Sequence, residues 1–457
     1  SFAQYCVADG KARTTGVHNY RLVMRNEQRN FLYDPTNLMS NDRIGATLIY
    51  HEREAYYDVG VRLKSSEHGR PKMTRVGFSV AFSPEYPFRG VHEKLAFDRS
   101  NGQEVGQQEM LLHTAMNHYG GFSKYHDLGY IIAPDDQHSS GVEVQMARYE
   151  QLYCQEMYGD AGGDGTLFEY ELIYPLTATV GNDPEGLKIP QEGGGVAGLS
   201  VSDYLGEDRE KYRWHFLIKN HRDQDNYAPI IRMTRALGLS GSVFEQAADQ
   251  YLDVSEWLQA FAVGSTAGVS DNWVSGSSHN ALFYHRPTDD KVLFFLQDLD
   301  YYNSSMPLKS NSTLRKLTQT PQWDRVFYGC VYDFLTTSFN RRYMARWAAH
   351  YATLLPEQPW GNWLNYIDNR HTNVMTQVLS SVPSQVPFEV LAVSGRTVIG
   401  RGWITVQQIR LLETGVPLEV VWQDWTMWQA QLPEGTKGGT LGAYNTRGML
   451  VETAVIP

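Results

Sequence analysis

The segment VLFFLQDLDYY, from Val292 to Tyr302, is an apolar run that ends in two aspartates. A run this apolar predicts a strand that is buried on both faces. Because side chains alternate along a strand, Asp298 and Asp300 are expected on the same face at its end. Two carboxylates there repel each other unless a metal ion or a basic side chain lies between them. The pair therefore indicates either a metal site or a structural ion pair.

Two more polar residues precede this strand within about thirty residues, in the stretch SDNWVSGSSHN. Asp271 follows a helix-like segment, and Asn280 closes the polar turn. Phosphoryl transfer needs a carboxylate that orients the acceptor hydroxyl, and it needs an asparagine and carboxylates that hold Mg²⁺ against the phosphates. Taken alone, Asp271 and Asn280 are common turn residues. Together with Asp298 and Asp300 they predict a metal-dependent phosphoryl-transfer site.

A basic stretch, VRLKSSEHGRPKMTRVGF, lies earlier in the chain. Cations on a hairpin loop suit nucleotide phosphates, and solvated charge on an edge strand explains them equally well. The candidate phosphate-binding residues are Arg62, Lys64, Arg70, Lys72 and Arg75. Glu109 and Glu150 are the candidate carboxylates to pair with one of these cations, and the spacing does not choose between them.

The first half of the chain predicts short strands and one helix. ATLIYHEREAYYDVGVRLK alternates apolar and polar residues, which is typical of a hairpin, and TRVGFSVAFS adds a third strand. Residues 103–119 carry apolar residues at helical spacing. Residues 128–158 predict a strand, a turn, and a second strand or helix. Residues 159–200 are rich in Gly and Asp, which predicts a loop that acts as a lid or linker.

The second half predicts helices and then strands. Residues 205–263 read as helical, and residues 280–302 read as two strands around HRPTDDK. Residues 321–383 are expected to be helical in three pieces, separated near Pro356, Pro359 and Gly361. From about Val386 to Pro457 the sequence alternates in short runs with Gly turns. This pattern predicts a small all-β sandwich.

Composition limits the classes of function. The 457 residues exceed what one hydrophobic core usually serves, so two or three domains are expected. The formal net charge is −11 and no dense Lys/Arg block is present, so no nucleic-acid partner is expected. The sequence has no apolar run of about 18 residues, so no membrane span is expected. Because the chain starts at Ser1 without a signal-peptide pattern, we expect a processed or excised segment of an exported protein.

Several well-known catalytic motifs are missing from the sequence. The histidines do not form H-E-x-x-H, no G-x-S-x-G is present, and the cysteines lack C-x-x-C spacing. A zinc hydrolase and an α/β-hydrolase are therefore disfavoured. One disulfide plus one thiol, or three buried thiols, are both compatible with the cysteines Cys6, Cys154 and Cys330.

The chain resembles the CotH kinase family, named for a spore coat protein kinase, over roughly residues 19–383. YYDVGVRLKSSEHGRPKMTRVGFSVAF resembles the basic hairpin of the family, and GVEVQMARYEQLYCQEMYG followed by GDGTLFEYE resembles its next block. YLDVSEWLQAFAVGSTAGVSDNW with HNALFYH resembles the catalytic segment, and KVLFFLQDLDYY resembles the strand that ends in W-D-l-D. Ser65 stands where the family has Gly, and Gln297 stands where it has Trp.

The resemblance implies a divergent protein-kinase-like fold. It also implies that the protein phosphorylates Ser residues of secreted or coat proteins. It implies that Asp271 is the catalytic carboxylate and that Asp298 is a metal ligand, with Asn280 and Asp300 nearby. ATP and Mg²⁺ or Mn²⁺ would bind between the N-terminal hairpin sheet and residues 271–300. On the nucleotide side, the expected contacts are Arg62, Lys64, Lys72 or Arg75, and Glu150.

We therefore expect an α+β protein of two domains. Residues 1–385 would form the CotH kinase-like domain, sheet-rich to about residue 200 and helical after it, and residues 386–457 an Ig-like β-sandwich. The expected function is an ATP- and metal-dependent atypical protein kinase, secreted or at the cell surface, that phosphorylates Ser or Thr of proteins there.

Two alternatives remain open at this point. One is a catalytically degenerate extracellular structural or binding protein on the same scaffold, with a surface assembly partner in place of a substrate. The other is a glycan- or matrix-binding adhesin. Its support is a set of three tryptophans, Trp422, Trp425 and Trp428, which would form an exposed sugar-binding platform. The favoured expectation is that these tryptophans pack in the core of the sandwich.

Overall fold

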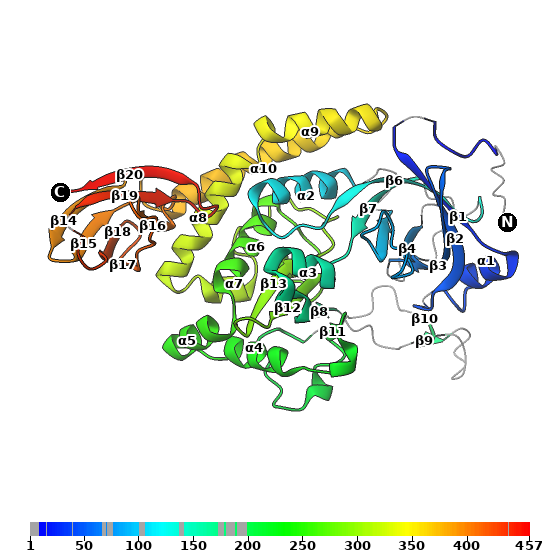
Figure 1. The fold of residues 1–457 in the computed structure, drawn as a ribbon, viewed down its shortest axis with the longest axis horizontal. Coiled ribbons are helices and arrows are strands. Elements are labelled where there is room, and N and C mark those ends of the chain that lie inside the picture. The colour runs from blue at the N-terminus through cyan, green and yellow to red at the C-terminus, as the bar shows by residue number, and fades with distance from the viewer. Residues whose placement is uncertain are drawn as a thin grey trace.

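The computed structural model describes residues 9–14, 16–38, 40–65, 70, 76–99, 106–136, 141–171, 178–179, 188–189, 199–436 and 438–457. Three parts follow one another along the long axis of the molecule (Figure 1). A strand barrel lies at the N-terminal end, a helical middle surrounds a small sheet, and a group of strands forms the C-terminal end. The expected mixture of helices and strands is confirmed. Within the described residues, no helix is long and apolar enough to cross a membrane.

Seven strands form a closed barrel in the order β1-β2-β3-β4-β5-β7-β6, and β1 pairs with β6 in parallel. The strands are β1 (His18–Val23), β2 (Ile44–Tyr50), β3 (Glu54–Lys64), β4 (Gly77–Ala81), β5 (Lys94–Asp98), β6 (His126–Ile132) and β7 (Gly141–Ala147). The predicted hairpin is confirmed as β2 and β3, and the predicted third strand as β4. Val61 and Leu63 of β3 are buried in the barrel core. Arg62 and Lys64 therefore lie on the outer face of the barrel, because side chains alternate along a strand.

Helix α2 (Gln107–Tyr119) is the helix predicted over residues 103–119 and joins the barrel to the helical middle. Most of its residues are buried. It shares one hydrophobic core with Val144 and Met146 of the barrel and with Phe334 of the helical middle. Because neighbours cover it on more than one side, α2 carries the carboxylate of Glu109 into the interior of the protein.

A four-stranded sheet, in the order β11-β8-β12-β13, lies in the middle of the molecule. Its strands are β8 (Thr166–Tyr170), β11 (Phe216–Ile218), β12 (Ala281–Arg286) and β13 (Lys291–Leu296). The two strands predicted over residues 280–302 are confirmed as β12 and β13. The loop predicted over residues 159–200 is wrong for β8, whose Leu167 and Phe168 are fully buried. Strand β8 is fixed by pairing with β11 and β12, which lie far along the chain. The local sequence, with glycines on both sides of the strand, therefore did not predict it.

Helices make up the rest of the helical middle, and α4, α5 and α6 pack against β13 of this sheet. The helices are α4 (Ala228–Gly238), α5 (Gly241–Tyr251), α6 (Val254–Ala267), α7 (Ser312–Leu317), α8 (Pro321–Thr337), α9 (Arg341–Leu354) and α10 (Trp360–Ser381). The three helical pieces predicted over residues 321–383 are confirmed as α8, α9 and α10. One break falls near Pro356 and Pro359 as expected. The other falls before α9, where Asn340 Oδ1 accepts from Tyr343 N (3.0 Å), and Gly361 lies inside α10.

Three smaller features complete this part of the chain. Helix α1 (Asn26–Tyr33) precedes β2, and α3 (Gln151–Tyr158) follows β7. The short strands β9 (Ala178–Thr179) and β10 (Lys188–Ile189) pair with each other. Cys154 of α3 and Cys330 of α8 are buried free thiols, and Cys6 lies outside the described residues.

The described chain after residue 386 contains strands in two sheets, β14-β15-β18-β17 and β16-β19-β20. The strands are β14 (Glu389–Ser394), β15 (Thr397–Arg401), β16 (Gln408–Leu411), β17 (Val420–Trp422), β18 (Met427–Gln431), β19 (Gly439–Tyr444) and β20 (Leu450–Ile456). Both sheets contribute to one core, which is how the sheets of a β-sandwich pack. The proposed boundary near residue 385 stays a prediction.

The tryptophans of this C-terminal part do not form an exposed platform. Trp428 is fully buried in the core of the two sheets. The guanidinium of Arg325, from α8, lies 3.2 Å from the ring centroid of Trp422. Trp425 packs against Tyr328 of the same helix. The tryptophan-based argument for a glycan-binding adhesin therefore loses its support.

Candidate functional site

The loop that carries Asp271 lies beside the segment that carries Asp298 and Asp300. Helix α6 ends at Ala267, and Gly268 follows in a left-handed conformation with φ 78°. A Cβ at Gly268 would lie 2.5 Å from the backbone oxygen of Asn303, so only glycine fits there. Ser270 N donates to Tyr301 O (2.9 Å), and Asn303 N donates to Gly268 O (2.8 Å). These bonds fix Asp271 next to the end of the D-x-D segment.

Asn272 is the buried anchor of this loop. Its Nδ2 donates to Asn280 O (2.8 Å) and to Gln297 O (2.6 Å). Its Oδ1 accepts from Val274 N (3.0 Å). Asn280 Nδ2 in turn donates to Asp271 O (2.8 Å). The structure thus brings Asn280 next to Asp271. The residue that holds the loop in place is Asn272.

Replacing Asn272 with alanine is expected to lower the free energy of unfolding by about 2 to 4 kcal/mol, because buried backbone groups would lose their partners. Chemical denaturation measures this loss. The matched control is Asp271→Asn, since that side chain is exposed and its replacement is expected to change stability by less than about 1 kcal/mol. Equal losses in the two variants would contradict the assignment of Asn272 as the anchor.

The D-x-D aspartates do not continue strand β13. The strand ends at Leu296, and Asp298 has φ 57°, so the expected placement of both carboxylates on one strand face is wrong. Asp271 and Asn280 also have positive φ, at 53° and 57°. Residues with a Cβ rarely adopt this conformation, and it is concentrated at functional sites. The tertiary fold, and not strand geometry, aims these side chains.

Four carboxylates meet near the D-x-D segment, and we call them the acid cluster. They are Asp98 at the end of β5, Glu109 of α2, Asp298 and Asp300. Lys64 Nζ is ion-paired with Asp98 Oδ2. Glu109 Oε1 accepts from Leu299 N (3.4 Å), and the backbone oxygen of Asp300 accepts from Gln108 Nε2 (2.8 Å). The barrel, α2 and the segment after β13 therefore converge on one point.

Sequence reasoning found part of this cluster. Asp298 and Asp300 were predicted as metal ligands, Lys64 was predicted separately as a phosphate contact, and Glu109 was one of two candidate carboxylates to pair with a cation. Asp98 was missed, although KLAFD has the same pattern as the D-x-D strand, an apolar run that ends in an aspartate. Lys124, in the link between α2 and β6, was also missed, and its sequence context gives no signal for it.

Burial and mutual repulsion shift three members of the acid cluster, Glu109, Asp298 and Asp300, toward their protonated forms. Burial raises the pKa of Asp298 most, Lys64 lowers it, and Asp98 and Glu109 raise it further. The resulting pKa of Asp298 is about 6. Burial and Asp298 raise the pKa of Asp300 to about 8. Burial and Asp98 raise the pKa of Glu109 to about 7. Burial opposes the charge of Lys64, but Asp98 and Asp298 outweigh it and raise the pKa of this lysine.

The protein in EDTA is expected to lose stability as the pH rises from about 5 to about 8. The unfolded chain releases the protons of these carboxylates near their ordinary pKa, while the folded chain retains them to about 6 to 8. The folded state thus binds more protons in this window. Asp300→Asn should make the decline shallower in denaturation curves taken across this range. The exposed Asp249→Asn is the control, and a decline as steep in Asp300→Asn as in the control would contradict the assignment.

Asp271 has a different environment. His279 Nε2 lies 3.0 Å from Asp271 Oδ1, and this hydrogen bond lowers the pKa of the carboxyl. Burial opposes protonation of His279, but Asp271 outweighs it and raises the pKa of the imidazole. The carboxylate itself remains exposed. Asp271 is therefore an ionised, accessible carboxylate beside a partly buried cluster of acids.

The remaining predicted residues that the structure describes lie on or near the barrel. Arg62 donates to Leu63 O (3.0 Å), and burial and the nearby arginines lower its pKa to about 10. Glu150 lies at the start of α3, where Lys94 Nζ is 3.2 Å from it and Arg148 Nε is 4.0 Å from it. Lys72 and Arg75 lie outside the described residues.

The donor chemistry of the acid cluster fits a divalent cation. Carboxylate oxygens are the ligands that Mg²⁺ prefers, and a cation would relieve their repulsion. Glu109 Oε2 is buried and has no hydrogen-bond partner. Among the described residues, no three acidic, His or Cys side chains are placed to hold a metal ion by themselves.

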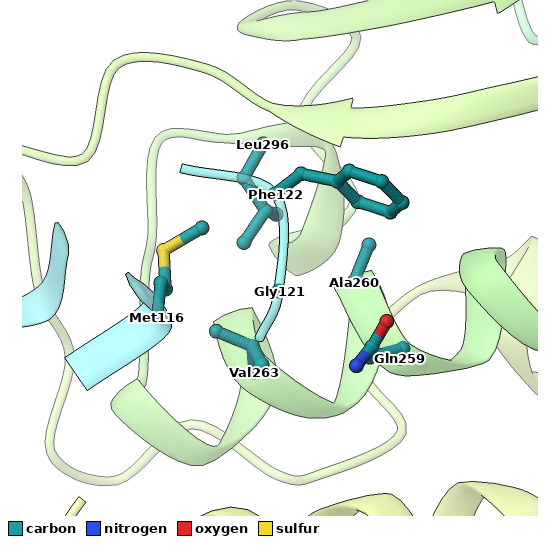
Figure 2. Close-up of a pocket in the computed structure, with 7 residues that line it drawn as sticks. All are labelled: Met116, Gly121, Phe122, Gln259, Ala260, Val263 and Leu296. Atoms are coloured by element: carbon teal, nitrogen blue, oxygen red, sulfur yellow. The ribbon is translucent and has the colours of Figure 1, made fainter. Parts of the chain in front are cut away.

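A small hollow lies behind this site, between the end of α2 and helix α6 (Figure 2). Its lining is apolar apart from Gln259, and it includes Phe122, Val263 and Leu296. Such a lining offers no groups for phosphates or metal, so the hollow is a packing feature and not part of the charged site.

Comparison with models of known protein families gives no match to this chain. Comparison with curated proteins gives no similar sequence either. The likeness to the CotH family therefore rests on the motifs of the sequence alone.

Proposed function

We propose that this chain is an atypical protein kinase of the CotH kind, which transfers phosphate from ATP to Ser or Thr of proteins. One observation carries the proposal: the half-buried Lys64 of the barrel, the buried Glu109 of α2 and the half-buried aspartates after β13 meet at one point. A cation for phosphates, a carboxylate on a nearby helix and aspartates for metal are the parts that a kinase site needs.

The finer fold belongs to the same proposal. The barrel would take the place of the N-terminal lobe of a kinase, and the helical middle would take the place of the C-terminal lobe. The strands after residue 386 would be an Ig-like module. Since the family resemblance concerns exported proteins, we also propose that the protein acts outside the cytoplasm, secreted or at the cell surface.

The residues divide into two sets of roles. Asp298 and Asp300, with Asn280 nearby, would hold Mg²⁺ or Mn²⁺, which neutralises charge on the phosphates when bound. Lys64 and Arg62 would contact the phosphates. Asp271 would accept a hydrogen bond from the acceptor hydroxyl, because its carboxylate is exposed and ionised at neutral pH. The bonds of Asn272 would keep it in place, so catalysis would be mostly positioning.

A catalytically degenerate binding protein on the same scaffold is the second candidate. Lys64 is ion-paired with Asp98 of β5, so part of the charge available for phosphates is already neutralised. Nucleotide binding without transfer to any protein would favour this candidate.

A thermal-shift titration with ATP and Mn²⁺ tests the proposal. The melting temperature is expected to rise with ATP only when Mn²⁺ is present, because a ligand stabilises the state that it binds. The rise should disappear in Asp298→Asn and persist in the exposed control Asp249→Asn. The absence of a shift in the unaltered protein at millimolar ATP would overturn the nucleotide site and with it the kinase proposal.

A further inference from the structure

Helix α9 carries a row of basic residues on its exposed face. Its sequence, RRYMARWAAHYATL, contains three arginines and one histidine but no acidic residue. Arg342, Arg346 and His350 are spaced four residues apart, so they lie in one row along the helix. All three residues are exposed. In Figure 1, α9 lies along the upper edge of the molecule with α10 and α2 on its inner side, so this row faces solvent.

The arginines of this row are not ion-paired, although other surface arginines of the chain are. Among the described residues, no carboxylate lies within ion-pair distance of Arg342 or Arg346. Helix α4 also carries two arginines and no acidic residue. There, Arg232 and Arg235 are each ion-paired with an acidic residue of the described chain. The α9 row therefore differs from the arginines whose charge the fold itself compensates.

Aromatic stacking holds Arg346 in place. Its guanidinium lies 4.1 Å from the ring centroid of Tyr343. The Tyr343 ring in turn stacks on the ring of His118 from α2, with the two centroids 3.9 Å apart. Stacking uses the flat face of a guanidinium and leaves the N–H donors at its edge free to meet an anion. Because the side chain is already ordered, less entropy is lost when an anion binds.

A third arginine lies where α9 and the C-terminal part approach the end of α2. Arg447, in the turn between β19 and β20, donates through Nη2 to His118 O (2.8 Å). Burial lowers the pKa of His118 most, and Arg447 and Arg346 lower it further, so both guanidiniums lie close to this imidazole. Asp333 also senses Arg447, but it is buried and already accepts two hydrogen bonds. His118 lies in the last turn of α2 and Glu109 in its first, so this surface is separate from the acid cluster.

We propose that Arg342, Arg346 and Arg447 form a docking surface for an acidic segment of a partner protein. The guanidiniums repel one another, and carboxylates placed between them would relieve that repulsion. Charge complementarity also selects the partner, because a surface of this sign attracts acidic segments and repels basic ones. In a chain of formal net charge −11, such a group of unpaired cations is a local feature and not a general property of the surface.

The spacing of the row favours an extended segment. Residues four apart in a helix are separated by about 6 Å along its axis. Alternate residues of an extended chain are about 6.6 Å apart and point to the same side. A segment with Asp or Glu at alternate positions therefore places successive carboxylates opposite Arg342 and Arg346. Each guanidinium can then donate to both oxygens of one carboxylate.

Fluorescence anisotropy with a labelled hexaglutamate peptide tests this surface. The unaltered protein should bind the peptide at low ionic strength and release it as salt is added, because salt screens exposed charges. The double variant Arg342→Gln with Arg346→Gln should bind about tenfold more weakly, as expected for the loss of two exposed ion pairs. Arg232→Gln with Arg235→Gln is the matched control, because it removes the same charge from arginines that already have partners. This control should bind as the unaltered protein does.

The remaining outcomes would overturn the proposal. They are no binding of hexaglutamate by the unaltered protein at low ionic strength, and equal binding by the α9 double variant, which should fold because both arginines are exposed. An oligothymidylate of the same charge that binds equally well would show a general anion surface and not a protein-docking one. A dimer of the unaltered protein in sedimentation that the double variant lacks would assign this face to a second copy of the chain. The proposed kinase reaction plays no part in this binding, so failure of either proposal leaves the other standing.

Discussion

Asp298→Asn is expected to lower the rate of phosphate transfer by about 100- to 1000-fold. The carboxylate lies in the acid cluster and would hold the metal ion that neutralises charge on the phosphates, and a neutral amide is a much weaker ligand for that ion. The variant should nevertheless fold and be at least as stable as the unaltered protein near pH 8. Replacing one of several repelling carboxylates with a neutral isostere removes part of their repulsion.

Transfer is measured as incorporation of labelled phosphate from ATP into a generic acceptor protein with Mn²⁺, and stability is measured by denaturation in EDTA. Asp249→Asn, on the exposed side of α5, is the matched control and should change neither quantity. Loss of activity with unchanged or higher stability separates a functional carboxylate from a structural one. Asp298→Asn that keeps full activity, or that unfolds the protein, would contradict the role given to this residue.

Arg325→Ala is expected to lower the free energy of unfolding by about 3 to 5 kcal/mol. Arg325 of α8 is 1% exposed and stacks on Trp422. Its Nε donates to Trp425 O (3.1 Å), and its guanidinium also donates to Trp403 O. These partners all belong to the part of the chain after residue 386, so the substitution would leave a cavity and unpaired buried carbonyls where that part joins the helical middle.

Arg325→Met separates the cost of the cavity from the cost of the lost hydrogen bonds, because methionine retains much of the volume of arginine but makes none of its hydrogen bonds. Its destabilisation should be smaller than that of Arg325→Ala. Arg342→Ala is the surface control and should cost less than about 0.5 kcal/mol. Limited proteolysis gives a second measurement, since loosening this junction should expose the chain between α10 and β14 to cleavage. A loss in Arg325→Ala no larger than that of the control would show that this arginine does not join the two parts.

Periodicity predicted most local elements of this fold. The β2–β3 hairpin, helix α2, the β12–β13 pair and the strands after residue 386 follow from alternation or helical spacing in the chain. Strand β8 did not, because it is five residues long and its burial depends on β11 and β12. The break before α9 is marked by the cap Asn340, a local signal that the proline-based prediction passed over.

The sequence by itself determined which kinds of side chain could serve a phosphoryl-transfer site, because Asp271, Asn280, Asp298 and Asp300 stand close together in the chain. It did not determine how they are aimed. Asp298 lies past the end of β13 in a left-handed conformation, which strand geometry does not predict.

Only the tertiary structure decided which charges meet. Lys64 pairs with Asp98, thirty-four residues away, and Glu109 reaches the backbone of Leu299 across a much longer separation. Such contacts depend on how the barrel, α2 and the central sheet pack against one another. Local sequence patterns describe a few neighbouring residues at a time, whereas a buried ion pair is fixed by burial and by the partners that packing brings within reach.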